Sequence, residues 1–143
     1  MKKFFVIIFA SFIFAGCAGS GLKSYGEYVS ATRNSEYSNV VVYRQSGFVG
    51  AGTIFTIILN GVELGKIGNS EFLIGEMQEG RNFLGVKVEG LQGVGLNKPR
   101  QTFEKTIERN IYFKVGYIGG LNLDAKIFIQ QISLQEFRSL AAN

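Results

Sequence analysis

The sequence contains no histidine and no tryptophan, and only one cysteine and one proline among its 143 residues. Histidine is the usual general base near neutral pH and the commonest metal ligand. Without it, neither a Ser-His-Asp triad nor a Cys-His pair can form within this chain. A single cysteine forms neither an internal disulfide nor a cysteine-rich zinc site. These absences favour a non-enzymatic protein and predict no metal and no other dissociable cofactor.

The first sixteen residues have the organisation of a secretion signal. Lys2 and Lys3 are followed by an apolar run over residues 4–14 and by two small residues. This order matches the positive, apolar and small-residue regions of a signal peptide. A retained membrane helix is the second interpretation, because the run is shorter than the ~20 residues that a spanning helix needs. Loss of residues 1–16 would lower the net charge of +4 by two.

The end of this segment, Phe14-Ala15-Gly16-Cys17, resembles the lipobox of bacterial lipoproteins, although leucine is usual where Phe14 stands. The resemblance implies cleavage before Cys17, a diacylglycerol thioether on its sulfur and an N-acyl chain such as palmitate. Two or more chains give stable membrane anchoring. Ala18 stands where aspartate retains lipoproteins in the inner membrane, so the resemblance implies the outer membrane, facing the periplasm. The alternative is a buried cysteine that packs as a small hydrophobe.

Three segments are expected along the chain: a cleaved signal peptide (1–16), the lipidated Cys17 with a Gly- and Ser-rich tether (17–39), and a folded domain (40–143). Within the domain, short runs of alternating apolar and polar residues predict strands separated by turns. We expect these strands at residues 40–44, 53–60, 62–67, 71–74, 81–88, 101–107, 111–118 and 127–132.

Local turn chemistry supports this division. Asn60-Gly61 is a strong signal for a type I′ hairpin, and Ser133 and Glu136 have the spacing of a helix capping box. The pattern predicts an all-β fold, a single antiparallel sandwich of the immunoglobulin-like or PEGA-like kind, with a short C-terminal helix. No stretch between strands is helical enough for a parallel crossover. The expected core includes Phe55, Leu84, Phe103 and Phe113.

Two glycine clusters, at residues 47–52 and 90–95, follow valine-rich strands. They are either a paired rim that contacts a partner or two ordinary loops, and loops of this kind are commonly variable and mobile. The candidate partner-binding residues in and near them are Tyr43, Arg44, Phe48, Gly50, Gly93 and Tyr117.

Catalysis by carboxylates would need a cleft that separates the pKa values of two of them. The candidates Glu71, Glu76, Glu79 and Asp124 are more simply explained as solvated charges, and they offer no obvious calcium loop. The basic residues are scattered and not gathered on one face, so a nucleic-acid partner is not expected.

Four segments resemble the DUF2846 family of small bacterial lipoproteins: residues 40–50, 59–73, 77–88 and 107–117. The matching motifs are Tyr43-Arg44, Asn60-Gly61 in place of the family's Asp-Gly, Gly80-Arg81-Asn82 in place of Gly-Lys-His, and Tyr112-Phe113 in place of Tyr-Tyr. The segment around Asn60 also resembles the PEGA β-domain. The resemblance implies a compact β-sandwich on the cell envelope.

The sequence therefore predicts a lipid-anchored, non-enzymatic envelope protein that binds another periplasmic or outer-membrane component, either a protein or peptidoglycan. The alternative is a carrier that holds a lipid or glycan between its sheets, which would require an open, apolar interior.

Overall fold

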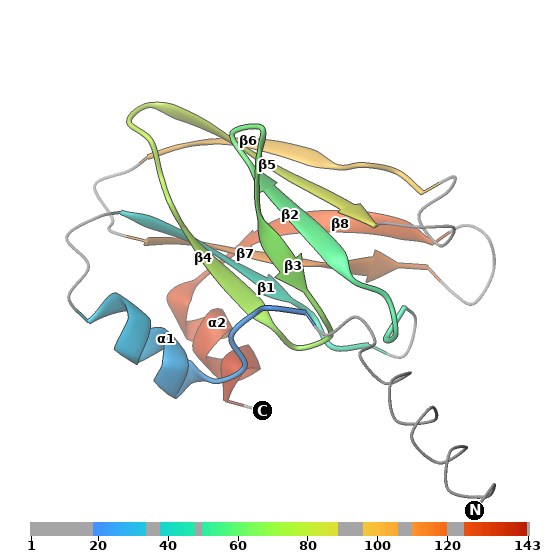
Figure 1. Ribbon diagram of the computed structural model, residues 1–143, viewed down its shortest axis with the longest axis horizontal. Helices are drawn as coiled ribbons and strands as arrows, with labels where there is room; N and C mark the ends of the chain where they lie inside the picture. Colours follow the sequence, from blue (N-terminus) through green and yellow to red (C-terminus); the bar gives the residue numbers. More distant parts are fainter. Residues whose placement is uncertain are drawn as a thin grey trace, which may run out of the picture.

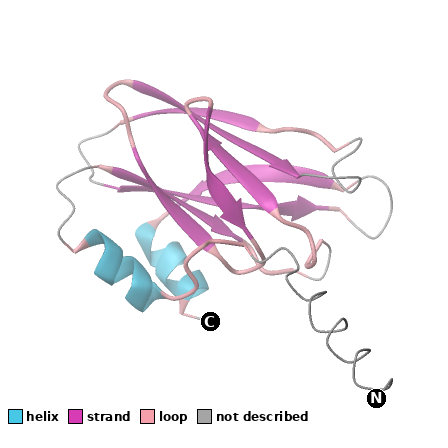
Figure 2. Ribbon diagram, in the orientation of Figure 1, coloured by secondary structure: helices cyan, strands magenta, loops and turns pink. Residues whose placement is uncertain are grey.

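The computed structural model describes residues 19–33, 38–47, 50–88, 96–105, 110–119 and 125–142. In these segments, eight strands form two four-stranded sheets that pack face to face. Two helices lie together against the outer face of one sheet (Figure 1). The predicted β-sandwich with a short C-terminal helix is confirmed (Figure 2). The signal peptide, Cys17, Phe48 and Gly93 lie outside the described residues.

The first sheet has the strand order β4-β1-β7-β8 and the second has the order β3-β2-β5-β6. The strands of the first sheet are β1 (Asn39–Arg44), β4 (Phe72–Glu76), β7 (Asn110–Ile118) and β8 (Lys126–Ile132). The strands of the second are β2 (Phe55–Leu59), β3 (Val62–Ile67), β5 (Arg81–Val88) and β6 (Arg100–Glu104). The helices are α1 (Tyr25–Thr32) and α2 (Leu134–Ala141).

The Asn60-Gly61 turn joins β2 to β3 as predicted. Asn60 has φ 52° and Gly61 has φ 83°, and a type I′ turn requires a positive φ at both of its central residues. The Asn60 side chain also accepts a hydrogen bond of 2.9 Å from the Phe83 amide on β5. This turn therefore sets the register of β2 against both of its neighbours.

The space between the two sheets is filled by apolar side chains. Strand alternation turns every second residue of β2, β5 and β7 inward. The four predicted core residues, Phe55, Leu84, Phe103 and Phe113, all belong to the buried apolar cluster between the sheets. Phe103 and Phe113 pack with their ring centres 5.0 Å apart. The inner faces of the sheets are therefore joined by a packed core.

A second core lies between the first sheet and the two helices. The apolar run of β1 is buried on both faces, so Val40 and Val42 face the other sheet while Val41 and Tyr43 face the helices. Phe137 of α2 is fully buried there. The remaining buried members are Tyr28, Phe72, Tyr112, Ile132 and Ala141.

One strand pair differs from the predicted antiparallel arrangement. β1 and β7 are parallel, with Val41 opposite Tyr112 and Val42 opposite Phe113. The chain between them contains five strands and crosses to the other sheet and back, so no single helix is needed as a crossover. A parallel pair needs a long connection, and here all four strands of the second sheet, together with β4, provide it.

The predicted tether is in part folded. Residues 25–32 form α1, whose Tyr28 is 6% exposed and packs into the second core. Ser24 and Glu27 close the start of this helix as a full capping box. The packed domain therefore begins well before residue 40, the boundary expected from the sequence.

Candidate interaction site

The alternation of β1 sends two predicted contact residues in opposite directions. Tyr43 is 3% exposed, and its hydroxyl donates a hydrogen bond of 3.3 Å to the carbonyl of Leu140 in α2. Burial raises the pKa of the Tyr43 phenol. Tyr43 is therefore a residue of the second core, and its prediction as a surface contact is wrong.

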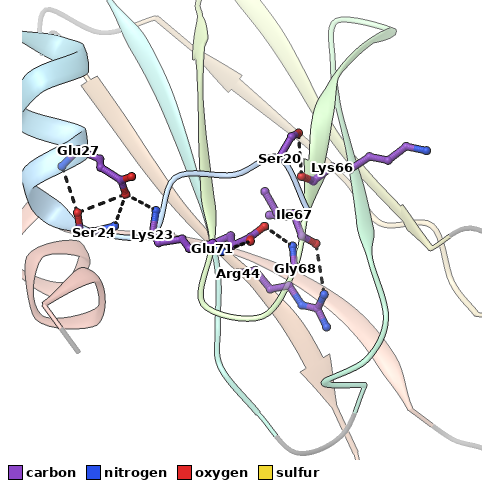
Figure 3. Close-up of polar contacts among 9 residues, drawn as sticks. All are labelled: Ser20, Lys23, Ser24, Glu27, Arg44, Lys66, Ile67, Gly68 and Glu71. Atoms are coloured by element: carbon purple, nitrogen blue, oxygen red, sulfur yellow. Dashed lines mark hydrogen bonds and ion pairs between the residues drawn. The ribbon is translucent and has the colours of Figure 1, made fainter. Parts of the chain in front are cut away.

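Arg44 turns the other way and is also buried, at 1% exposure. Its guanidinium donates to the backbone carbonyls of Gly50, Thr53 and Ile67, the last of which is visible in Figure 3. Burial lowers the pKa of Arg44 from its ordinary value. The guanidinium thus ties the loop after β1 to the end of β3, and it is not free to contact a partner directly.

Gly50 and Tyr117 lie directly against each other. Gly50 has φ 71°, and a Cβ atom built there would be 2.1 Å from the Tyr117 ring. Only glycine combines this backbone conformation with so close a neighbour. The Tyr117 hydroxyl is 3.2 Å from Thr53 Oγ1, and its ring packs edge-on against Phe55 at 5.1 Å. Arg44, Gly50 and Tyr117, chosen from separate parts of the sequence, therefore form one cluster.

A hollow of about 190 Å³ opens beside this cluster, at the end of β1 and β7. We call it the Arg44 hollow; its lining residues are Arg44, Gln45, Ser46, Gly47, Gly116, Tyr117 and Gly119. Gln45, Ser46 and Gly47 are exposed. The hollow combines an aromatic wall with accessible polar groups, which is a surface that can accept a side chain from another molecule.

A wider depression of about 490 Å³ lies beside the start of α2. Asn110, Tyr112, Gln131 and Leu134 are among its lining residues. None of the predicted contact residues belongs to it.

The amino-terminal end of the described chain is hydrogen-bonded to both sheets. Residues 19–23, which we call the strap, run between β3 and β4 (Figure 3). The Ser20 amide donates 2.9 Å to the Lys66 carbonyl of β3. Leu22 and Phe72 exchange two backbone hydrogen bonds of 2.8 and 2.9 Å. The strap therefore closes the edge that β3 and β4 share.

Glu71 lies under this strap. Its side chain is 8% exposed, accepts a hydrogen bond of 2.8 Å from the Gly68 amide, and lies 3.7 Å from the ammonium of Lys23. Glu76 is at the opposite end of β4, and the exposed Glu79 pairs with Lys105. The structure therefore separates Glu71 from Glu76 and Glu79, which line one surface depression, and Asp124 lies outside the described residues.

The described segments contain no group of three or more Cys, Asp or Glu side chains that could hold a metal ion. No helix in them is long and apolar enough to cross a bilayer.

The sequence held one signal for the missed helix α1. Ser24 and Glu27 have the same spacing as Ser133 and Glu136, and both serines cap their helices by accepting from the glutamate amide. The strap had no comparable signal, because its hydrogen bonds join residues about 50 positions apart.

No family model and no curated protein sequence matches the chain. Among solved structures, the chain is similar to an NMR structure of a protein from Eubacterium rectale. The two share 12% sequence identity and a TM-score of 0.42, over 69% of this chain and 93% of the other.

Proposed function

We propose that the protein is a lipid-anchored, non-enzymatic lipoprotein of the bacterial envelope that binds another envelope component through the Arg44 hollow. Acylation of Cys17 would hold it on the outer membrane, facing the periplasm. Its partner is an envelope protein or a peptidoglycan fragment. The lipobox-like residues before Cys17 and the resemblance to DUF2846 lipoproteins support the location.

The observation that carries the binding proposal is the assembly of Arg44, Gly50 and Tyr117 at one rigid end of the sandwich. The buried guanidinium, which lines the hollow, is itself fixed by three carbonyls of two segments, so this part of the hollow is preorganised. A preformed surface loses less conformational entropy when a partner binds. The cluster is thus a supporting structure for the exposed residues Gln45 and Ser46 beside it.

The size of the hollow favours a macromolecular partner over a free small ligand. Small-molecule sites usually enclose roughly 300–1,000 Å³, whereas this hollow holds about 190 Å³. That volume suits one side chain or one small chemical group of a larger molecule.

The alternative, a carrier of lipid or glycan between the sheets, has less support. Phe55, Leu84, Phe103 and Phe113 occupy the space that such a ligand would need. The Arg44 hollow and the depression beside α2 both lie at the surface.

The anchor is tested by the mass of the mature protein. We expect the chain purified from membranes to begin at Cys17 and to carry the mass of a diacylglycerol and an acyl group. Cys17→Ala should abolish both the mass gain and the membrane retention. A soluble mature chain that begins at another residue would refute this part of the proposal.

Binding is tested by photocrosslinking in cells. A photoreactive amino acid at Ser46 should capture a defined envelope component that the same group at Glu79, at the far end of β4, does not capture. Gly47→Trp should abolish capture by filling the hollow. Gly52→Trp is the matched control, because a Cβ atom at either glycine has no neighbour within 4 Å, yet Gly52 is not part of the lining. Equal capture with both variants would exclude the hollow as the contact.

A further inference from the structure

The strap fixes the point at which the domain meets its anchor. A Cβ atom at Gly19 would be 2.0 Å from Glu71 Oε2 and 2.4 Å from the Gly68 amide, so the backbone of Gly19 is in close contact with this loop. The amide of the next residue, Ser20, is hydrogen-bonded to β3. The packed contacts of the strap therefore extend as far as Gly19.

Very little chain separates this packed point from Cys17. Two peptide steps lead from Cys17 to Gly19, and a fully extended chain spans at most ~3.6 Å per residue, or about 7 Å in all. In contrast, a flexible tether over residues 17–39 would let the domain move tens of ångströms from the lipid. Once Cys17 is acylated, the domain therefore has almost no freedom to leave the bilayer surface.

Loops at one end of the sandwich lie next to Gly19. Gly68 and Asn69 follow β3 directly, and Asn69 Oδ1 accepts a hydrogen bond of 3.2 Å from the amide of Gly47. This bond joins the 67–71 loop to the segment after β1, which lines the Arg44 hollow. The two loops form one surface, which we call the anchor end (residues 44–47 and 67–71).

The charge of the anchor end suits a lipid headgroup layer. Glu71 is its only carboxylate by sequence, and this group is buried beside the Gly68 amide and Lys23. The exposed residues Gln45, Ser46 and Asn69 are polar and uncharged, and the Lys23 side chain, 72% exposed, adds a positive charge at the strap. Because Lys23 pairs with Glu71, this surface exposes no unpaired carboxylate that a phosphate-bearing headgroup layer would repel.

We infer that the anchor end faces the bilayer, so that the sandwich is held at the membrane surface by the strap and the Asn60-Gly61 turn points away from it. The Arg44 hollow then opens at the headgroup layer, and the component that it binds is one that reaches the membrane surface. This inference rests on the proposed acylation of Cys17. The six residues of β3 span ~20 Å, which separates the anchor end from the far end of the domain.

Depth measurements on the full-length lipidated protein test this orientation. Because Cys17 is the only cysteine and its sulfur is used in the thioether, a cysteine introduced elsewhere carries the only free thiol. A fluorophore is attached at Asn69→Cys and, separately, at Ser46→Cys on the anchor end. Glu79→Cys, 86% exposed at the far end, is the matched control. The proteins are reconstituted in phosphatidylcholine vesicles that contain headgroup-spin-labelled phosphatidylcholine as quencher.

We expect quenching at residues 69 and 46 to be several-fold stronger than at residue 79. Insertion of ten Gly and Ser residues between Ala18 and Gly19 should remove this difference, because such a linker reaches ~17 Å on average. Equal quenching at all three positions, in samples whose mass confirms the acylated Cys17, would overturn the orientation and leave the anchor intact. A sample whose mass shows no lipid would overturn the proposed function itself.

Discussion

The guanidinium carbon of Arg44 lies 4.2 Å from the centre of the Phe55 ring, inside the sandwich. This cation–π contact is shielded from water, since Arg44 is 1% exposed and Phe55 is fully buried. The same guanidinium also donates 3.2 Å to Thr53 Oγ1 and reaches three backbone carbonyls. One side chain therefore links the loop after β1, the end of β3 and the Phe55 ring.

Replacing Arg44 should be costly even when the positive charge is kept. Lysine lacks the planar fork that reaches several acceptors at once, so Arg44→Lys loses several of these hydrogen bonds while it keeps a positive charge in a buried place. We expect a loss of about 2–3 kcal/mol in the free energy of unfolding, measured by urea denaturation. Arg138→Lys is the control, because Arg138 also lies over a ring, that of Tyr25, but at the surface. That variant should stay within about 0.5 kcal/mol of wild type; equal losses in both variants would contradict the role assigned to Arg44.

Gly50→Ala should destabilise the loop that borders the Arg44 hollow. An alanine at φ 71° costs roughly 1–2 kcal/mol, and its Cβ atom would also displace the Tyr117 ring. Gly52→Ala, where a Cβ atom meets open space, should be neutral or slightly stabilising. Thermal unfolding of the two variants measures the difference, and matching melting temperatures would refute the prediction.

The stability of the protein should fall in alkaline solution because of Tyr112. Its hydroxyl is 2.7 Å from that of Tyr28, and burial, followed by this hydrogen bond, raises the pKa of Tyr112. A tyrosine in the unfolded chain ionises near pH ~10, below the pKa of folded Tyr112. Above that pH the unfolded state binds fewer protons than the folded state, so the free energy of unfolding decreases with rising pH.

Tyr112→Phe removes this ionisation and should make the decrease shallower. Urea titrations at about pH 8, 10 and 11 give the slope for each protein. Some slope should remain in the variant, because the pKa of Tyr43 is also raised. Parallel curves for wild type and variant would show that Tyr112 does not contribute.

Gly21→Ala should release the strap without unfolding the domain. A Cβ atom at Gly21 would lie 2.8 Å from Glu71 Cβ and 2.9 Å from Ile67 Cγ2, so the strap would have to move away from β3. Hydrogen exchange of the Ser20 and Leu22 amides should then become much faster. Gly26→Ala in α1 meets only Ser24 Oγ at 3.8 Å; it should keep this protection and gain up to ~1 kcal/mol in helix stability. Unchanged exchange in Gly21→Ala would contradict the close packing.

Local features of this fold were predictable because their causes are local. The positive φ values of Asn60 and Gly61 follow from the two residue types alone. The alternation of β7 placed Phe113 and Val115 in the core, and Ser133 marked the start of α2. Each of these predictions depends on residues within a few positions of one another.

Features set by distant residues were not predictable in the same way. The parallel pairing of β1 with β7 joins strands about 70 residues apart, on the edge of β1 that β4 does not occupy. Arg44, Gly50 and Tyr117 were all candidates by sequence and lie together in the fold, but the burial of Arg44 depends on carbonyls up to 23 residues away. Tyr43 was misplaced because α2, near the end of the chain, covers that face of β1.

The strap has a mechanical consequence. A force applied at its amino end would act on the Ser20–Lys66 bond and then on the paired bonds of Leu22 and Phe72. Because these bonds attach to β3 in one sheet and β4 in the other, the strap carries the load from one sheet to the other. Tension on the lipid that we propose at Cys17 would therefore reach both sheets of the sandwich through the strap.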